Sequence, residues 1–128
     1  MQNEKGYENL QIYERSYKAG LAVYRMTKAY PTEERYALTD QMRRASVSIP
    51  LNIAEGYAKC ESQSEFKRYL LMALGSCNEM SVLIEYSRDL SYITKEQYEK
   101  ASREYDELGR MLNAFIQTVT QKETRSRI

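Results

Sequence analysis

Residues 62–87, SQSEFKRYLLMALGSCNEMSVLIEYS, carry the pattern that decides the fold. The stretch opens with Ser62 and Glu65 at the spacing of a capping box, in which the two side chains bond each other's free backbone amides at a helix start. Apolar or small residues then recur at alternating steps of four and three, the heptad seam of helix bundles. The seam consists of Phe66, Leu70, Ala73, Cys77, Met80, Ile84 and Ser87.

The residues before this stretch predict two more helices with the same spacing. The first covers residues 10–30 and ends there because Pro31 pushes the preceding residue out of helical conformation. The second begins between Thr32 and Thr39 and reaches residues 55–59. The expected buried residues are Leu10, Tyr13, Tyr17, Leu21 and Tyr24 in the first helix and Leu38, Met42, Ala45, Ile49, Ile53 and Tyr57 in the second.

A fourth helix opens at Thr94 and Gln97, which have the spacing of a second capping box. It is expected to bury Tyr98, Ala101, Tyr105, Leu108, Leu112, Phe115 and Val119. No segment shows the strict alternation of a half-buried strand. The sequence therefore predicts an all-α fold, an antiparallel up-down four-helix bundle. Residues 1–128 form one domain, with about nine N-terminal and about seven C-terminal residues frayed.

The second helix contains Pro50, which removes a backbone hydrogen bond and costs about 3 kcal/mol in a helix interior. Two short helices are the alternative to one kinked helix. The apolar row of Ala45, Ile49 and Ile53 crosses the proline without losing phase, and Ile49 would be a poor cap for a new helix. One helix with a kink at Ser46 and Pro50 is favoured, because the small Ser46 leaves room for the bend.

Composition argues against several classes of protein. The net charge is +1 and the isoelectric point about 7.7, whereas dedicated nucleic-acid-binding domains usually exceed about 9, so any basic surface must be local. The longest uncharged stretch, Met111–Gln121, has eleven residues, and a membrane helix needs roughly 20. The first ten residues lack the apolar core of a signal peptide. We expect a cytoplasmic protein with no membrane partner.

The residues that usually carry catalysis and metal binding are scarce. Histidine, the commonest general base and metal ligand, does not occur in the sequence. The two cysteines, Cys60 and Cys77, are far apart and form no zinc-binding motif. We therefore expect a non-enzymatic protein without metal, cofactor or small-molecule substrate.

The second and third helices carry more apolar surface than one small bundle can bury, because each helix has a single inward face. Monomeric proteins rarely leave such patches exposed, which favours a homo-oligomer. The expected oligomer interface comprises Val47, Leu51, Ala54, Met72, Leu83 and Tyr86.

Three stretches are similar to a known family: LTDQMRRASVSIPLNIAEG (residues 38–56), EFKRYLLMALGSCNE (65–79) and LGRMLNAFI (108–116). They resemble small four-helix-bundle proteins encoded within intervening sequences of bacterial large-subunit (23S) rRNA genes, often labelled ribosomal-protein-like. The likeness extends from about Tyr13 to Ile116. It implies ring-forming oligomers, with a pentamer as the expected size. Accessory proteins of diversity-generating retroelements are a related group that implies an RNA or ribonucleoprotein partner.

Four basic residues are the candidates for contact with nucleic acid: Arg43, Arg44, Lys67 and Arg68. Arg43 and Arg44 point about 100° apart on a helix, and intramolecular pairing with an acid is the favoured alternative to phosphate contact. Lys67 and Arg68 lie at a helix start, where a solvated face is the simpler explanation.

Together these features predict a non-enzymatic oligomeric adaptor that contacts RNA or a ribonucleoprotein. The alternative is a self-assembling scaffold for protein–protein interaction that binds no nucleic acid.

Overall fold

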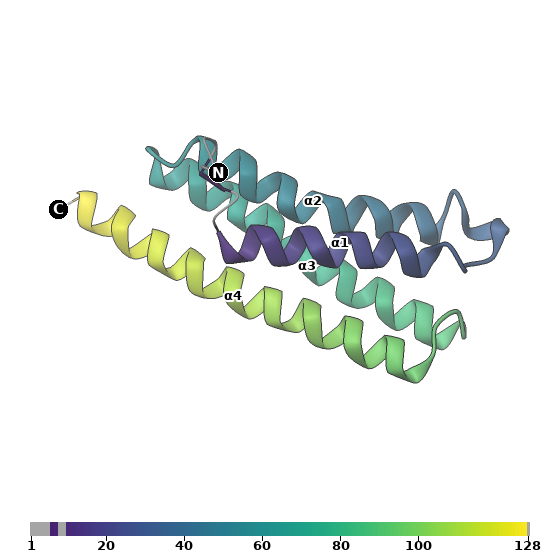
Figure 1. The fold of residues 1–128 in the computed structure, drawn as a ribbon. Coiled ribbons are helices and arrows are strands. Elements are labelled where there is room, and N and C mark those ends of the chain that lie inside the picture. The colour runs from purple at the N-terminus through teal and green to yellow at the C-terminus, as the bar shows by residue number, and fades with distance from the viewer. Residues whose placement is uncertain (1–5, 8–9, 128) are drawn as a thin grey trace.

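Four helices account for nearly all of the residues that the computed structural model describes, which are 6–7 and 10–127. They are α1 (Gln11–Thr27), α2 (Leu38–Ala58), α3 (Gln63–Asp89) and α4 (Lys95–Arg127), and a 3-10 turn, η2 (Thr32–Glu34), precedes α2. Figure 1 shows the helices running alternately up and down. Among the pairs of α-helices that are in contact, α2–α3 and α3–α4 pack most extensively and α1–α4 packs least. The predicted all-α antiparallel bundle is confirmed.

The two predicted capping motifs differ in how complete they are. At the start of α4, the Thr94 amide donates to Oε1 of Gln97 (2.8 Å) and the Gln97 amide donates to Oγ1 of Thr94 (3.1 Å). At the start of α3, the Glu65 amide donates to Oγ of Ser62 (3.3 Å), but the Glu65 carboxylate binds Arg68 instead of completing the box. Both caps satisfy amides that the first helical turn leaves free.

The core follows the predicted seams of α2, α3 and α4. Every residue of the α3 heptad seam is buried, as are Ile49 and Ile53 on either side of Pro50. Helix α2 is one continuous α-helix with the proline in its interior, as predicted. The α4 seam is buried at Tyr105, Leu108, Leu112 and Val119, and Ile116 is buried in place of Phe115, which is half-buried.

The predicted burial of α1 is wrong, because the helix is rotated from the expected orientation. Its inward residues are Ile12, Ser16, Ala19, Gly20, Val23 and Thr27. Three of the five residues expected inside lie at the surface, with exposed fractions of 51% for Tyr17 and 40% for both Leu21 and Tyr24, whereas Leu10 and Tyr13 are half-buried against the core. Small inward residues bring α1 close to α2: a Cβ on Gly20 would lie 3.6 Å from the carbonyl oxygen of Ser46. Tyrosine tolerates the surface because its hydroxyl stays hydrated.

The structure tests the predicted fraying of the two chain ends only in part. Helix α4 continues through Arg127. Most of the N-terminal residues predicted to fray lie outside the described residues. Within the described part of the chain, no helix combines the length and hydropathy needed to cross a membrane.

We expect Ile49→Ala to lower the free energy of unfolding by about 2–5 kcal/mol, because the side chain is fully buried. Leu51→Ala, two residues away on the same helix and 61% exposed, should cost under about 1 kcal/mol. Urea titration at two protein concentrations measures both values and separates any contribution from assembly. Equal losses for the two variants would contradict the position of α2 described here.

Candidate functional site

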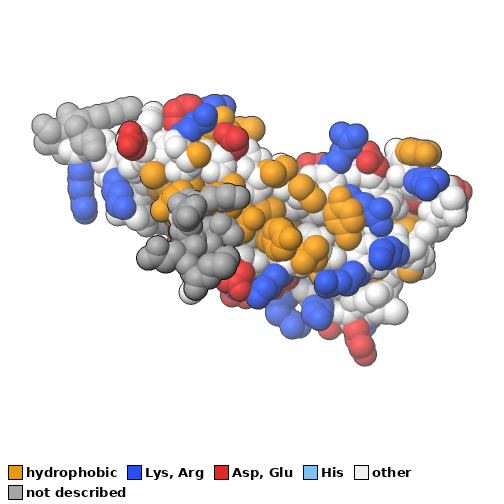
Figure 2. Space-filling view, turned by 45° about the horizontal axis from the view of Figure 1, so that its top comes forward, with side chains coloured by type: hydrophobic (Ala, Val, Ile, Leu, Met, Phe, Trp, Pro, Cys, Tyr) orange, Lys and Arg blue, Asp and Glu red, His pale blue; other side chains and the backbone are white. Residues whose placement is uncertain are grey.

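A contiguous apolar area lies on the outer side of α1 and α2. We call it the α1–α2 patch, and it consists of Tyr17, Leu21, Tyr24, Val47, Leu51 and Ala54. These residues line one shallow groove of about 220 Å³ between the two helices. Leu51 is the most exposed of them, at 61%. Figure 2 shows hydrophobic side chains gathered at the middle of one face of the molecule, with Lys and Arg side chains along its edge. Exposed apolar areas of this kind typically bind other proteins.

The proline lies beneath this patch. Pro50 is buried and lines the same groove, together with Ser46 and Gly20. Proline has no N–H to donate to the carbonyl of Ser46, four residues earlier, and this carbonyl oxygen faces Gly20 of α1. The Ser46 hydroxyl donates to the carbonyl of Arg43 (3.1 Å). The proline site is therefore accommodated between α1 and α2 of one chain.

Helix α3 carries a second set of exposed apolar side chains, the α3 strip. Its members have exposed fractions between 46% and 59%, and they are Leu71, Met72, Val82, Tyr86 and Leu90. Met72 and Tyr86 are thus exposed as expected of interface residues. Leu83 is not: it is 7% exposed and belongs to the buried core together with its neighbour Ile84. The expectation that Leu83 supplies exposed interface surface is corrected.

A polar row on α2 separates the patch from the strip. The Ser48 hydroxyl shares a hydrogen bond with the Ser76 hydroxyl of α3 (2.9 Å). The Asn52 amide donates to both the carbonyl oxygen (2.8 Å) and the hydroxyl oxygen (3.0 Å) of Ser48. Arg44 and Glu55 complete the row at the surface. The apolar surface of α1 to α3 is thus divided into two areas that could meet different neighbours.

Arg43 is half-buried and is held against α1 by intramolecular contacts. Its Nε donates to Oγ1 of Thr27 (3.0 Å) and its Nη2 donates to the carbonyl of Tyr24 (3.3 Å), near the C-terminus of α1. The guanidinium carbon lies 4.7 Å from the centre of the Tyr24 ring, within cation–π range. This cation therefore joins α2 to the C-terminal end of α1, where the helix dipole favours positive charge.

The other three predicted cations are at the surface in two separate places. Arg44 pairs with Asp40 (2.9 Å), and Arg68 pairs with Glu65 (3.1 Å) while lying over the Tyr69 ring. Because α2 and α3 are antiparallel, Lys67 is level with the end of α2, about 14 residues or roughly 20 Å from Arg43 along the helix axis. The four predicted cations do not form one site.

Helix α1 provides cations that the sequence patterns did not single out. Lys18, Arg25 and Lys28 are exposed, and within the described residues Arg25 and Lys28 have no hydrogen bond or ion pair. They flank the exposed Tyr17 and Tyr24. The available signal was charge, since residues 11–30 hold four bases and one acid. It was missed because the tyrosines were assigned to the core.

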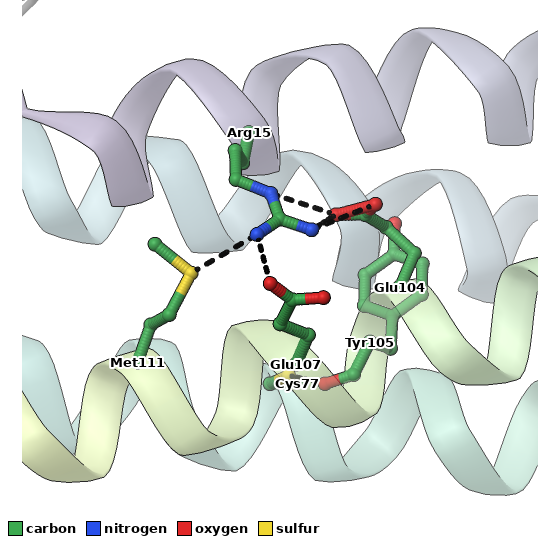
Figure 3. A network of polar contacts seen from close by, with 6 residues as sticks. All are labelled: Arg15, Cys77, Glu104, Tyr105, Glu107 and Met111. Atoms are coloured by element: carbon green, nitrogen blue, oxygen red, sulfur yellow. Dashed lines mark hydrogen bonds and ion pairs between the residues drawn. The ribbon is translucent and has the colours of Figure 1, made fainter.

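One polar network joins α1 to α4 (Figure 3). Arg15 of α1 donates from Nη2 to Glu104 (2.7 Å), and from Nη1 to Glu107 and to the sulfur of Met111 (3.5 Å). These contacts raise the pKa of Arg15 and lower the pKa of Glu107. The network spans the two helices that otherwise pack least.

Comparison with known proteins identifies the family. The family described as 23S rRNA-intervening sequence protein matches residues 8–114. The chain belongs to this family. A structural relative, a protein of unknown function from the S23 ribosomal protein family of Bacteroides thetaiotaomicron, is 26% identical. The match has a TM-score of 0.75 and covers 83% of this chain and 95% of that chain. A search of curated proteins found no match.

The family match covers α1, α2, α3 and most of α4, and so includes both apolar areas and the network around Arg15. Neither description names an enzymatic activity. In the described part of the chain, His, Cys, Asp and Glu form no group of three or more that could hold a metal ion.

The Arg15 network makes a prediction about pH. The bond from Arg15 lowers the folded-state pKa of Glu107 below the ordinary 4.5. The stabilisation that the Arg15–Glu107 pair provides is therefore complete above about pH 4.5. It is lost as the pH falls through the lowered folded-state pKa of Glu107. We expect Arg15→Met to reduce the free energy of unfolding near pH 7 and to converge with the wild type in acid. Denaturant titrations from pH 7 to 3 measure the free energy of unfolding of each protein. A difference between Arg15→Met and the wild type that does not change with pH would contradict the prediction. The same pH-dependent difference for the exposed control Arg103→Met would also contradict it.

Proposed function

We propose that the chain is a non-enzymatic subunit of a homo-oligomer that contacts RNA or a ribonucleoprotein. The observation that carries the proposal is the exposed apolar surface of a single chain, above all Leu51 at 61% and Tyr86 at 59%. Burying apolar surface contributes about 25 cal/mol per Å², so copies that cover these areas gain stability.

Two apolar areas on different sides of the polar row favour a closed ring over an isolated dimer. When the patch of one copy meets the strip of the next, the contact is head-to-tail, and such contacts generate rings when the rotation closes. The resemblance to ring-forming bundles makes five copies the expected size. Met72, Tyr86, Val47, Leu51 and Ala54 remain the proposed interface residues.

The proposed RNA contact uses the basic edge of α1. Lys18, Arg25 and Lys28 lie on the solvent side of this helix and are not part of the α1–α2 patch, and exposed cations attract the phosphate backbone of nucleic acid. The family description, which refers to 23S rRNA, supports RNA as the ligand. Because Arg43, Arg44 and Arg68 have intramolecular partners, they are secondary to Arg25 and Lys28, which have none within the described residues.

The same intramolecular pairs favour one alternative. If the arginines of α2 and α3 serve only to stabilise the bundle, the protein is a self-assembling scaffold without a nucleic-acid ligand. The two functions share the oligomer and differ only in the basic edge.

The assembly half of the proposal is tested by introducing a charged side chain into each exposed apolar area. We expect Leu51→Glu to reduce the oligomer mass by desolvating a charge in the interface, while helix content measured by circular dichroism stays unchanged. Gln41→Glu, also exposed on α2 but outside the patch, is the matched control. Light scattering measures both masses. An unchanged mass for Leu51→Glu together with Tyr86→Glu would contradict the proposed interfaces.

The RNA half is tested by fluorescence anisotropy with labelled 23S rRNA fragments at several salt concentrations. We expect affinity to fall steeply with salt, and the doubly substituted Arg25→Glu, Lys28→Glu protein to lose at least about tenfold in affinity. Arg103→Glu, on the exposed side of α4, should bind as the wild type does. Binding that is absent at about 50 mM salt, or equal for all three proteins, would support the scaffold alternative.

A further inference from the structure

The α1–α4 side of the bundle contains a groove that shares Lys18 and Arg25 with the proposed RNA contact and is otherwise separate from it. Helices α1 and α4 approach each other near Arg15 and diverge toward the C-terminal end of α1 (Figure 1). The groove between the diverging segments has a volume of about 600 Å³. Small-molecule sites usually measure about 300–1,000 Å³. Its walls are mainly apolar, and they include Ala19, Ala22, Val23, Met26 and Ala101.

Small side chains keep this groove open. Alanines occupy the facing positions, so no side chain fills the space that the divergence creates. The Arg15 network fixes the helix separation at one end of the groove, since Arg15 and Glu104 both line it. The groove is thus formed by two helices whose separation is fixed at one end, and binding sites for small molecules are usually preformed in this way.

One residue that lines the groove, Tyr105, has a buried hydroxyl. Tyr105 is 2% exposed and lines the groove, and its hydroxyl is the one buried side-chain oxygen or nitrogen without a hydrogen-bond partner in the described chain. Figure 3 shows the ring rising from α4 toward α1, with the hydroxyl at its tip. Burial raises the pKa of Tyr105 well above its usual range, so the hydroxyl remains a donor. A buried polar group without a partner is rare in native proteins.

The charges around the groove are predominantly positive. Four cations line it, Arg15, Lys18, Arg25 and Lys100, against the single acid Glu104. Arg15 and Lys18 are engaged in ion pairs, whereas Arg25 and Lys100 have none within the described residues. An apolar groove with unpaired cations at its rim is complementary to an apolar molecule that carries a negative group.

We propose that this groove binds a small amphipathic organic anion. The apolar body of the ligand packs against the alanines, a carboxylate meets Lys100 and Arg25 at the mouth, and an oxygen on the apolar body accepts a hydrogen bond from Tyr105. The inference does not depend on oligomer formation or RNA binding.

Equilibrium dialysis of the full chain with 2-naphthoate tests the charge requirement. We expect saturable binding at least about tenfold tighter than that of the uncharged 2-naphthalenemethanol, equivalent to about 1.4 kcal/mol. Lys100→Gln should remove most of that preference. No saturable binding of 2-naphthoate, or equal binding of the charged and uncharged compounds, would overturn the proposal.

Two further variants locate the site. Ala22→Trp fills the groove from an exposed position and should abolish binding, whereas Ala114→Trp, exposed on α4 outside the groove, should not. We expect 6-hydroxy-2-naphthoate to bind several-fold tighter than 2-naphthoate, and Tyr105→Phe to erase this gain while leaving 2-naphthoate binding unchanged. Binding that survives Ala22→Trp would overturn the site. So would a loss of oligomer mass in Ala22→Trp without ligand, because a second copy would then occupy the groove.

Discussion

Close backbone contact between α1 and α2 at Gly20 and Ser46 determines how the rest of the surface is arranged. A helix that approaches its neighbour this closely has room inward only for small residues, and α1 supplies Ser16, Ala19 and Gly20 there. Its large apolar side chains therefore face outward and combine with Leu51 of α2 in the α1–α2 patch. The same contact places the carbonyl left free by Pro50 against Gly20, inside a single chain. The proline thus supports the bundle, and its helix contributes the patch.

The sequence was sufficient to predict the elements and the core of α2, α3 and α4. Their buried seams combine large apolar side chains with heptad spacing, and both signals point to the same face. Helix α1 has two faces with the required spacing, one large and aromatic and one small. The larger side chains led to the prediction that the aromatic face is buried, which is wrong. The small face is buried because α1 packs closely on α2, and such a close approach leaves no periodic signal in the sequence of α1. Leu83 was wrongly predicted to be exposed for a related reason. Helix α3 packs on both α2 and α4, so the adjacent residues Leu83 and Ile84 are both buried.

The site residues were harder to predict than the fold. Periodicity gives the face on which a cation lies, but it does not show whether an acid or a carbonyl is within reach. Arg43 shows this, because its partners Thr27 and Tyr24 belong to another helix. The groove between α1 and α4 was likewise invisible in the sequence. It arises from the angle between two helices held at one end by Arg15.

The central claim is that one chain leaves more apolar surface exposed than it can keep in water, so that copies cover it for one another. Sedimentation equilibrium of the unmodified protein over a wide concentration range tests this most directly. The account predicts the mass of an oligomer, with five 15.0 kDa chains as the expected number. This mass should stay constant on dilution into the micromolar range. A single 15.0 kDa species at the highest concentration reached would contradict it.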